Sequence, residues 1–493
     1  MPTTAILGGG LSGLSTAYYL SRALPPSHKI VLLEKSKRFG GWIHTFRHES
    51  GISFEAGPRS VRPVGLQGLL TLDLIDQLGL SSKLVTVSKS DPAARNRYIY
   101  YKSRLKKAPS SLGSAIASSF SSDSPFFGLL SSIASEPFRS RNSAGDDESV
   151  DSFVKRRFGA KFAEDVLSAL VHGIYAGDTR TLSIQAVFPS LWRLEQKFGS
   201  VVIGMLFGGI KPPELEIAAK QELENRLGPF VKRMKQVSVY SLQDGLEMLP
   251  SALVQYLKSQ PNVEMRNGSS ATKLSYDGKK FALDTPSDSF TASNIISALS
   301  SSTLDPFVQL PHLSHNPSVT VGVVNLAFAK PFKLPVQGFG YLIPRSVTAL
   351  QNPHQALGVV FDSDMFASEG HTKVTVMLGG AYWNGRTIPT EQELEMQALD
   401  TLRIHGVIPD TVEPIFRRAY VQRDCIPQYL VGHAMRMKEL HLALLKRYDG
   451  KLGLVGSSYS GVGLNDCVKS SWELTTRLLA EGRATGLESF TLH

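Results

Sequence analysis

A glycine turn near the start of the chain has the residue types and spacing of a phosphate-binding site. Gly8-Gly9-Gly10-Leu11-Ser12-Gly13 follows a short apolar run and matches G-x-G-x-x-G. The next segment has helical apolar spacing, residues 29–33 are typical of a second buried strand, and Glu34 ends that strand 21 residues beyond Gly13. Glycines let a pyrophosphate approach backbone N–H groups at a helix N-terminus, and the acid accepts from ribose hydroxyls. This order of elements predicts a Rossmann-like dinucleotide-binding unit.

A second glycine turn directly after the acid narrows the choice of dinucleotide. Lys35 follows Glu34, and Arg38-Phe39-Gly40-Gly41-Trp42 then resembles the R-x-G-G signature of amine-oxidase-type flavoproteins. NAD-dependent dehydrogenases lack this second turn, and a carboxylate at Glu34 would repel the 2′-phosphate of NADP. We therefore expect FAD.

A third segment, far downstream, has a similar pattern. Residues 452–456 indicate a strand that ends in glycine, and Val462-Gly463-Leu464 leads into an apolar-spaced helix. A helix N-terminus aimed at a ligand stabilises negative charge, which suits a reduced flavin. On this stretch alone, an ordinary strand–helix joint is the alternative.

Size and composition set the frame for these motifs. The chain has 493 residues, 42% of them hydrophobic and 19% charged, so we expect a folded protein of two or three domains. Only two cysteines occur, which gives no disulfide framework and favours a reducing compartment. The net charge of +10 suits anionic lipid, nucleic acid or acidic small molecules without choosing among them.

No membrane-spanning helix is expected. The longest apolar stretch, residues 201–210, is about half the ~20 residues that a spanning helix needs. The early glycine turn leaves no room for a removable signal peptide, although residues 1–33 carry no acid and an internal targeting signal could lie there.

Several longer motifs carry a resemblance to one family. GPRSVRP at residues 57–63, RNRYIYY at 95–101 and CIPQY at 425–429 are not shared by flavoproteins in general, and GSSYSGVGLNDC at 456–467 belongs to the same match. With the glycine turns, they make nearly the whole chain resemble the oxygen-dependent, mitochondrial-type protoporphyrinogen oxidases of the amine-oxidase-like flavoprotein superfamily.

The resemblance implies an α/β fold of three parts. A discontinuous Rossmann-like FAD-binding domain would comprise residues 1–90, 240–300 and 430–493. A mixed-sheet substrate-binding domain would comprise residues 216–239 and 301–429, where Val319–Phe328 and Val374–Leu378 look like strands. Residues 91–215 would form a mostly helical, membrane-associated domain, with a mobile polar loop at residues 138–151.

The resemblance also implies an activity in heme biosynthesis. The chain would oxidise protoporphyrinogen IX to protoporphyrin IX with FAD as cofactor and molecular oxygen as acceptor, releasing hydrogen peroxide. The sequence has no Ser-His-Asp pattern, no H-E-x-x-H and no Cys/His metal spacing, so we predict no metal site. That absence agrees with an oxidation performed by the cofactor, in which the protein supplies position.

Particular residues take roles by the resemblance. Arg97 would anchor a substrate propionate, since guanidinium binds carboxylate bidentately and keeps its charge in an apolar pocket. Phe339 and Leu342 would clamp a pyrrole ring. Two positions would be catalytic: Arg59, near the flavin, and Gly173, which would face the reacting ring. Met377 would line the substrate pocket. The residues that would bind FAD are Gly8, Gly9, Gly10, Leu11, Ser12, Gly13, Glu34, Lys35, Arg38, Gly41, Trp42, Gly57, Pro58, Arg59, Ser60, Ala271, Val462, Gly463 and Leu464.

Most of these residues also have ordinary structural interpretations. Without the family, Arg97 would be a surface arginine, and Arg59 would be part of a domain-interface ion pair. Phe339, Leu342 and Met377 would be core residues, and Gly173 would end a helix.

Membrane association and partners are the last expectations. Residues 92–122 hold six basic residues and no acid, and apolar stretches follow. Such a surface suits monotopic binding to an anionic bilayer, here the inner mitochondrial membrane. Buried helix is the alternative. We expect no nucleic-acid partner, because the basic residues lack a recognition motif. Ferrochelatase, as recipient of the product, and a second copy of the chain are candidate partners.

Two other functions share this architecture. An amine oxidase or carotenoid desaturase would use the same cofactor, but arginine near the substrate repels a cationic amine. A flavin-free escort-type binding protein would not need the intact glycine set and Glu34.

Overall fold

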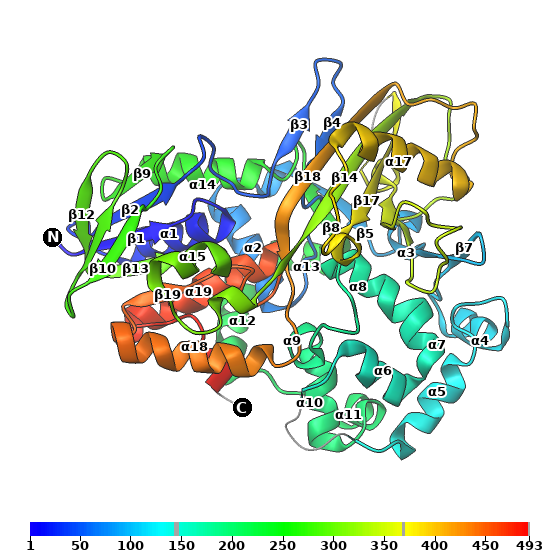
Figure 1. Ribbon diagram of the computed structural model, residues 1–493, viewed down its shortest axis with the longest axis horizontal. Helices are drawn as coiled ribbons and strands as arrows, with labels where there is room; N and C mark the ends of the chain where they lie inside the picture. Colours follow the sequence, from blue (N-terminus) through cyan, green and yellow to red (C-terminus); the bar gives the residue numbers. More distant parts are fainter. Residues whose placement is uncertain (142–146, 367–369, 492–493) are drawn as a thin grey trace. The chain divides into compact units, whose positions relative to one another are not determined.

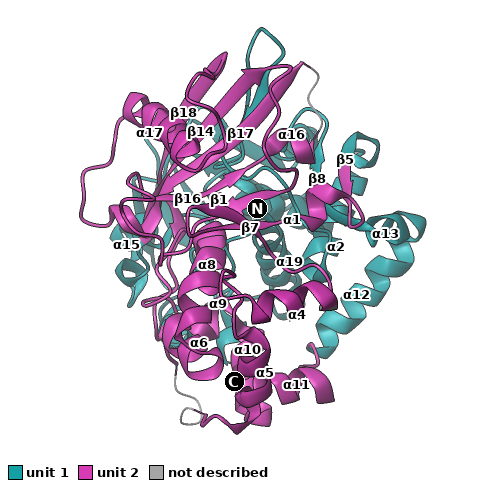
Figure 2. Ribbon diagram, turned by 90° about the vertical axis from the view of Figure 1, so that its right-hand side faces the viewer, with its two compact units in different colours: residues 1–85, 213–317, 433–493 teal, residues 86–212, 318–432 magenta. Residues whose placement is uncertain are grey.

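The computed structural model describes residues 1–141, 147–366 and 370–491. The chain forms two compact units, coloured separately in Figure 2. Unit 1 consists of residues 1–85, 213–317 and 433–493, and unit 2 consists of residues 86–212 and 318–432. Each unit is therefore assembled from segments that are distant in the sequence, which Figure 1 shows as a change of colour within each unit.

A parallel sheet of five strands is the centre of unit 1 (Figure 1). Its strand order is β19-β13-β1-β2-β9, with Ile6 of β1 opposite Leu32 of β2 and Ile296 of β13. Side chains alternate between the two faces, so Ile6 and Leu32 pack with helices α1, α2, α14 and α19. Leu7 and Leu33 pack on the other face with α15, α18 and the antiparallel sheet β10-β11-β12. A parallel sheet covered on both faces confirms the predicted Rossmann-like α/β fold.

The elements of unit 1 are, in chain order, β1 (Thr3–Leu7), α1 (Leu11–Ala23), β2 (Lys29–Glu34), β3 (Thr45–Arg47), β4 (Ser53–Glu55), α2 (Gly65–Gln77), η1 (Ser81–Lys83), α12 (Glu214–Leu227), α13 (Pro229–Met234), β8 (Val237–Leu242), α14 (Met248–Lys258), β9 (Val263–Asn267), β10 (Lys273–Tyr276), β11 (Phe281–Asp284), β12 (Ser289–Ala292), β13 (Asn294–Ser297), α15 (Ser301–Val308), η4 (Leu313–His315), α18 (His433–Tyr448), β19 (Leu452–Leu454), α19 (Leu464–Glu481) and η6 (Glu488–Thr491). The chain passes from unit 1 into unit 2 within β5 (Leu84–Ser88).

Unit 2 contains a mixed sheet of seven strands in the order β18-β14-β17-β16-β15-β6-β7. Only the β15–β6 pair is parallel within this sheet. Helix α17 packs on one face, where its Leu394 and Leu402 belong to the same apolar cluster as Val376 and Tyr341. Helix α8 lies on the other face, beside β15 and β16. The predicted strands at 319–328 and 374–378 are confirmed as parts of β14 and β17.

The elements of unit 2 are α3 (Pro92–Arg95), β6 (Tyr98–Tyr101), β7 (Arg104–Lys107), α4 (Leu112–Phe120), α5 (Leu129–Ser135), η2 (Glu136–Phe138), α6 (Val150–Phe158), α7 (Ala160–Phe162), η3 (Ala163–Leu167), α8 (Ser168–Tyr175), α9 (Ile184–Val187), α10 (Pro189–Phe198), α11 (Val201–Phe207), β14 (Ser318–Ala329), β15 (Gly340–Leu342), β16 (Ala356–Val360), α16 (Asp362–Met365), β17 (His371–Gly379), η5 (Gly380–Trp383), α17 (Glu391–Ile404) and β18 (Phe416–Pro427).

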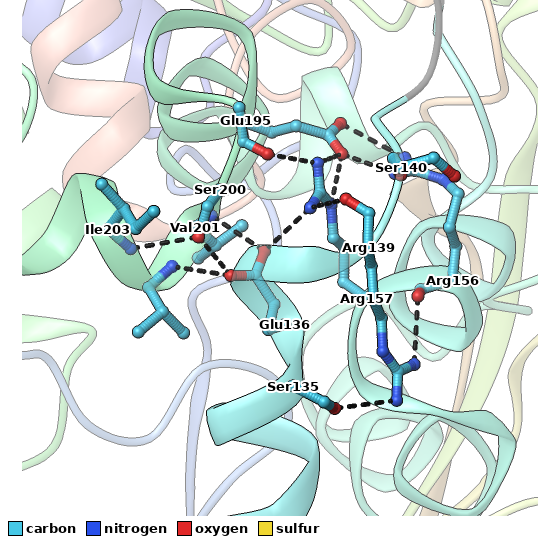
Figure 3. Close-up of polar contacts among 12 residues, drawn as sticks. Ser135, Glu136, Arg139, Ser140, Arg156, Arg157, Glu195, Ser200, Val201 and Ile203 are labelled. Carbon is cyan, nitrogen blue, oxygen red and sulfur yellow. Dashed lines mark hydrogen bonds and ion pairs between the residues drawn. The ribbon is translucent and has the colours of Figure 1, made fainter.

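A buried ion network ties the helices of unit 2 together (Figure 3). Arg157 of α6 is fully buried between Glu195 of α10 and Glu136 of η2, with 3.2 Å to the Glu136 carboxylate. Glu136 also accepts from the backbone N–H groups of Val201 and Val202, at 3.0 and 3.2 Å, and so caps the N-terminus of α11. Because removing one partner would leave a buried charge unpaired, this network fixes α11 against α6 and α10.

Three segments differ from the sequence expectations. Residues 301–317, placed with the substrate-binding domain, lie in unit 1, because Leu304 and Val308 of α15 pack into its core. Residues 98–107, placed in the helical part, form β6 and β7 of the mixed sheet, because Tyr98 and Tyr100 supply the apolar face that packs in its core. Residues 216–239, placed with the substrate-binding domain, lie in unit 1, because Leu223 and Leu227 of α12 pack into its core. Of the loop predicted at 138–151, residues 142–146 lie outside the described residues, and α6 begins at Val150.

Within the described part of the chain, every helix is too short or too polar to span a bilayer.

Candidate active site

The first glycine turn joins β1 to α1 in the conformation that the sequence predicts. Gly8 has φ +100°, and α1 begins at Leu11 with Gly10 as its N-cap. A Cβ atom at Gly13 would overlap the carbonyl oxygen of Gly8, and one at Gly9 would overlap the Phe39 ring. Only glycine fits at Gly9 and Gly13. The first turn of α1 contains no acidic side chain that would compete for an anion.

Glu34 ends β2 beside this turn. Its carboxylate accepts from the backbone N–H groups of Gly9 and Ser36, each at 2.8 Å. The backbone of Ser269 donates to the Glu34 carbonyl at 2.9 Å, so the segment that leads to the partly buried Ala271 runs alongside. Glu34 therefore lies at the glycine turn, and Ala271 follows the end of β9, the strand that pairs with β2. A nucleoside-binding site is expected at this carboxyl edge of the parallel sheet.

The second glycine turn folds back onto the first. The Gly40 N–H donates to the Gly9 carbonyl at 2.8 Å, and a Cβ atom at Gly41 would lie 3.1 Å from the Cα of Gly10. Gly40 and Gly41 both have positive φ, which glycine adopts without strain. Lys35 and Trp42 are exposed next to this turn.

The Gly57-Pro58-Arg59-Ser60 segment packs against the same turn. A Cβ atom at Gly57 would overlap the carbonyl oxygen of Trp42. Arg59 is close enough to Glu55 for its charge to lower the pKa of that carboxyl, yet burial prevails and raises the Glu55 pKa to about 7. Glu55 was not singled out from the sequence.

The C-terminal segment reaches the first turn of α1. A Cβ atom at Gly456 would lie 3.3 Å from the Ser12 hydroxyl, and Ser471 of α19 donates to the Ser12 carbonyl at 2.8 Å. Val462 and Gly463 precede Leu464, the first residue of α19. The Asp466 carboxylate accepts from the Gly463 N–H at 3.0 Å, so this helix end already carries one acid of its own.

The two cysteines are free thiols. Cys467 packs against the core of unit 1, and burial raises its pKa to about 11, so the thiol is protonated and packs as a small apolar group.

These segments fit a dinucleotide. Two glycine turns whose Cα atoms approach each other, a helix N-terminus without competing acids and a carboxylate at the strand end provide the donors and the space that a pyrophosphate and a ribose need. The residues present therefore fit FAD, which the resemblance implies.

A second group of predicted residues gathers in unit 2. The Arg97 guanidinium lies 5.2 Å from the centroid of the Phe339 ring, in cation–π geometry. The Phe339 N–H donates to the Asn96 carbonyl at 2.9 Å, so the chain before β15 is fixed to the chain before β6. Arg97 and Phe339, 242 positions apart in the sequence, are thus neighbours.

Leu342 and Met377 lie on one face of the mixed sheet. Leu342 of β15 pairs with Gly358 of β16, and Gly358 pairs with Met377 of β17. Directly paired residues point to the same face, so these three form a row across the sheet. Gly358 lets the Leu342 side chain lie close to the sheet, because a Cβ atom there would come 3.0 Å from a Leu342 methyl. Sequence reasoning missed Gly358, although a glycine inside a strand is a signal of close approach.

Gly173 of α8 faces the same row. A Cβ atom there would lie 2.7 Å from a terminal methyl of Leu342. The neighbouring His172 fixes α8 to the sheet, because its Nδ1 is 2.7 Å from the Ile343 carbonyl oxygen. Burial lowers the pKa of His172, so it is neutral and donates to that oxygen. The structure therefore brings Arg97 to Phe339, and it places Leu342, Met377 and Gly173 on one side of the mixed sheet.

Nearly the whole chain is similar to known flavoproteins. The sequence model of the family "Flavin containing amine oxidoreductase" matches residues 11–479. The chain is 35% identical to a protoporphyrinogen oxidase of Schizosaccharomyces pombe, with 96% of this chain and 98% of that protein covered. It is 34% identical to the protoporphyrinogen oxidase of Homo sapiens, with 97% and 98% covered. A solved structure of a candidate protoporphyrinogen oxidase from Exiguobacterium sp. 255-15 superposes with a TM-score of 0.76 at 25% identity, covering 97% of this chain and 99% of that one.

Proposed function

The chain belongs to the flavin-containing amine oxidoreductases and, among them, to the protoporphyrinogen oxidase family, and from this premise we propose its reaction. It oxidises protoporphyrinogen IX to protoporphyrin IX, with FAD as cofactor and molecular oxygen as electron acceptor, as a step of heme biosynthesis. The substrate loses six hydrogens, so three molecules of oxygen are reduced to three of hydrogen peroxide in three successive two-electron oxidations.

The pairing of Arg97 with Phe339 beside an apolar sheet face is the observation that supports this substrate most directly. Protoporphyrinogen IX is a flexible apolar macrocycle with two propionates. An apolar row of Leu342 and Met377 suits the ring, and a guanidinium that keeps its charge suits a propionate. A cationic amine, the substrate type of an amine oxidase, would be repelled by Arg97.

The roles in unit 2 follow from this pose. Arg97 anchors a propionate, and Phe339 and Leu342 hold a pyrrole ring between them. Met377 adapts to the ring edge because its thioether chain is flexible. The absence of a side chain at Gly173 lets Leu342 pack against α8, so that Leu342 stays clear of the reacting ring.

Unit 1 would hold FAD through the glycine turn at residues 8–13, Glu34, the turn at 38–42, the segment 57–60, Ala271 and residues 462–464. Bound FAD supplies the acceptor for a hydride, which the side chains of the protein cannot provide. Arg59 favours negative charge on the reduced cofactor. The pyrrole N–H protons leave to solvent, so the protein needs little acid–base machinery and contributes mainly position.

We also propose monotopic binding to the inner mitochondrial membrane through unit 2. Four large apolar side chains of its helical part are at least 73% exposed: Phe120, Phe138, Leu206 and Phe207. Basic residues of the 92–107 segment would add attraction to anionic lipid, about 1 kcal/mol each where well placed. A membrane location would bring the apolar product close to ferrochelatase. A homodimer is a further expected state.

The test uses the purified protein. A yellow preparation with flavin absorbance, and the appearance of protoporphyrin fluorescence from protoporphyrinogen IX in air above the rate of autoxidation, are the expected results. A colourless protein that binds no added FAD would contradict the cofactor assignment. A flavin-containing protein without protoporphyrin formation would contradict the substrate.

A further inference from the structure

The second glycine turn of unit 1 is held by a guanidinium from within. Arg38 donates to three backbone carbonyls of its own turn, those of Phe39 at 3.1 Å, Ile43 at 2.9 Å and Gly41 at 2.5 Å. Three of the turn's acceptors are therefore directed at the guanidinium. Since carbonyl oxygens repel an anion, collecting them on Arg38 makes the turn more favourable to a diphosphate nearby.

Glu247 binds both ends of this turn. Its Oε1 lies 3.4 Å from Arg38, at the start, and its Oε2 accepts from the backbone N–H of Thr45 at 3.0 Å, at the end. His44 lies 3.2 Å from the same oxygen through its Nδ1. The Glu247 side chain is only 18% exposed, so solvent screens these contacts less than a surface ion pair.

A second carboxyl supports the same residue of the turn. Glu55 of β4 accepts from the Thr45 hydroxyl at 3.0 Å and from the Leu246 N–H at 2.8 Å. Thr45 is therefore fixed between two carboxyl groups, one on β4 and one at the start of α14. The turn at residues 38–45 is tied to two elements of the unit 1 core and has little freedom to open.

The position of this turn matters because Gly41 approaches Gly10 of the phosphate-binding turn. Gly40 and Gly41 have positive φ. Because glycine adopts many backbone conformations, this turn would sample others if its two ends were not fixed. Fixing the ends reduces the conformational entropy that ligand binding would otherwise cost.

We propose that Glu247 and Arg38 are positioning residues for FAD: they form a clasp that holds the 38–45 turn against the first glycine turn, ready for the diphosphate. Neither side chain needs to touch the cofactor for this effect. The inference rests on the proposed FAD-dependent function and adds Glu247 to the residues that control cofactor affinity.

The test measures FAD release from purified holoprotein by the recovery of free-flavin fluorescence after dilution. Glu247→Gln keeps an oxygen for the Thr45 N–H but loses the charge that faces Arg38, and Glu247→Ala loses both. Glu264→Gln is the matched control. Glu264 of β9 forms an ion pair with Lys29 of β2 at 2.6 Å, away from the turn at residues 38–45. We expect FAD affinity to fall roughly ten-fold in Glu247→Ala (about 1.4 kcal/mol), less in Glu247→Gln, and not in the control.

A double-mutant cycle separates the clasp from a general loss of stability. If the pair acts as one device, Glu247→Ala adds little to the FAD loss of Arg38→Ala, and the bound flavin spectrum shifts similarly in both variants. Additive losses, or an unchanged FAD affinity in Glu247→Ala, would overturn the inference. A wild-type protein that binds no FAD would instead overturn the proposed function on which it rests. If Glu247→Ala fails to fold, Glu247→Gln decides alone.

Discussion

At the residue scale, Arg97 is the side chain whose loss should change substrate binding most. In Arg97→Ala a charge-assisted contact to a propionate disappears, worth about 1.5–3 kcal/mol, so we expect KM for protoporphyrinogen IX to rise ten-fold or more. The effect on kcat should be smaller, because the guanidinium lies over Phe339 and is assigned to anchoring. Aerobic protoporphyrin fluorescence at varied substrate concentration measures both constants.

Arg95→Ala is the matched control for this experiment. Arg95 lies two residues earlier, at the end of α3, and is exposed. Its removal changes the net charge equally, so a general electrostatic effect would lower substrate binding in both variants. An unchanged KM in Arg97→Ala, or an equal rise in the two variants, would remove Arg97 from the anchor role.

Two glycines beside Leu342 should respond differently to alanine. In Gly173→Ala the new Cβ meets a terminal methyl of Leu342 at 2.7 Å, and that side chain can rotate away. We expect a small change in Tm but at least a several-fold loss of kcat/KM, because Leu342 moves into the substrate face. In Gly358→Ala the Cβ meets the Tyr341 carbonyl oxygen at 2.8 Å, and backbone cannot yield so readily. There we expect a loss of stability of about 1–3 kcal/mol.

Thermal unfolding and steady-state kinetics on the same preparations separate the two cases. Equal losses of Tm in both variants would mean that Gly173 is a packing position only.

The sequence predicted the site residues unevenly. The glycines at 8–13 and Glu34 follow from spacing, because a strand, a tight turn and a helix can be recognised locally. Arg97, Phe339, Leu342 and Met377 came from resemblance alone, since their proximity depends on strand pairing between distant segments. Glu247 was missed for a similar reason: an acid before a helix has many ordinary roles, and its contacts to residues 38–45 exist only in the folded chain.

At the element scale, local sequence patterns predicted the buried strands correctly. They failed for elements whose place in the fold depends on which distant segment they pack against. The strands β1, β2 and β13 contain short runs of buried apolar residues that can be recognised locally. The strand β6 is short and aromatic and β7 is short and basic, and both join the sheet because β6 pairs with β15. Helix α12 is mostly polar and joins unit 1 through two leucines that a 14-residue pattern does not distinguish from surface residues.

Helix α11 is the element that we expect to enter the bilayer interface. Leu206 and Phe207 at its end are 73% and 75% exposed, while Glu136 and Arg157 fix its other end (Figure 3). We expect the double variant Leu206→Ser/Phe207→Ser to bind vesicles of anionic phospholipid several-fold more weakly in a flotation assay. The reason is that two large apolar side chains no longer enter the interface between lipid and water. Its activity in detergent should remain.

Leu350→Ser controls for the loss of any exposed leucine, because Leu350 is 89% exposed in the loop between β15 and β16. That variant should float like the unchanged protein. If the α11 double variant also floats normally, this helix is not the docking element, whatever surface binds lipid.

At the scale of the whole molecule, buried titratable groups predict that the two units respond differently to acid. Burial lowers the pKa of His405 in unit 2 to about 4 and that of His433 in unit 1 to about 4. The unfolded chain takes up these protons near pH 6.5 and the folded chain does not. The stability from each group is therefore full above pH 6.5 and is lost as the pH falls through about 4, up to about 3 kcal/mol each.

Glu55 opposes this trend in unit 1 only. Its pKa is raised to about 7, so its contribution is full below about pH 4.5 and is lost as the pH rises through 7. As the pH falls from 7 to 5, Glu55 adds stability to unit 1 while His433 removes it, so the two contributions partly cancel. His405 is the one of these three groups that lies in unit 2, and its contribution only falls. The contributions of these three groups therefore predict a larger loss of stability in unit 2 than in unit 1 over this range. Urea titrations at pH 7 and 5, followed by hydrogen-exchange labelling at one fixed pH, report the two units separately.

His405→Gln tests the cause of that difference. The Tyr341 hydroxyl lies 2.8 Å from His405 Nδ1, and the Gln351 carbonyl oxygen lies 3.1 Å from Nε2, so the neutral ring accepts from one and donates to the other. Protonation of Nδ1 removes the acceptor that Tyr341 needs. Glutamine offers one acceptor and one donor without titrating, so the variant should unfold in unit 2 with a smaller difference between pH 7 and 5, even if it is less stable at both. An unchanged pH difference in unit 2 would show that its acid response comes from groups other than His405.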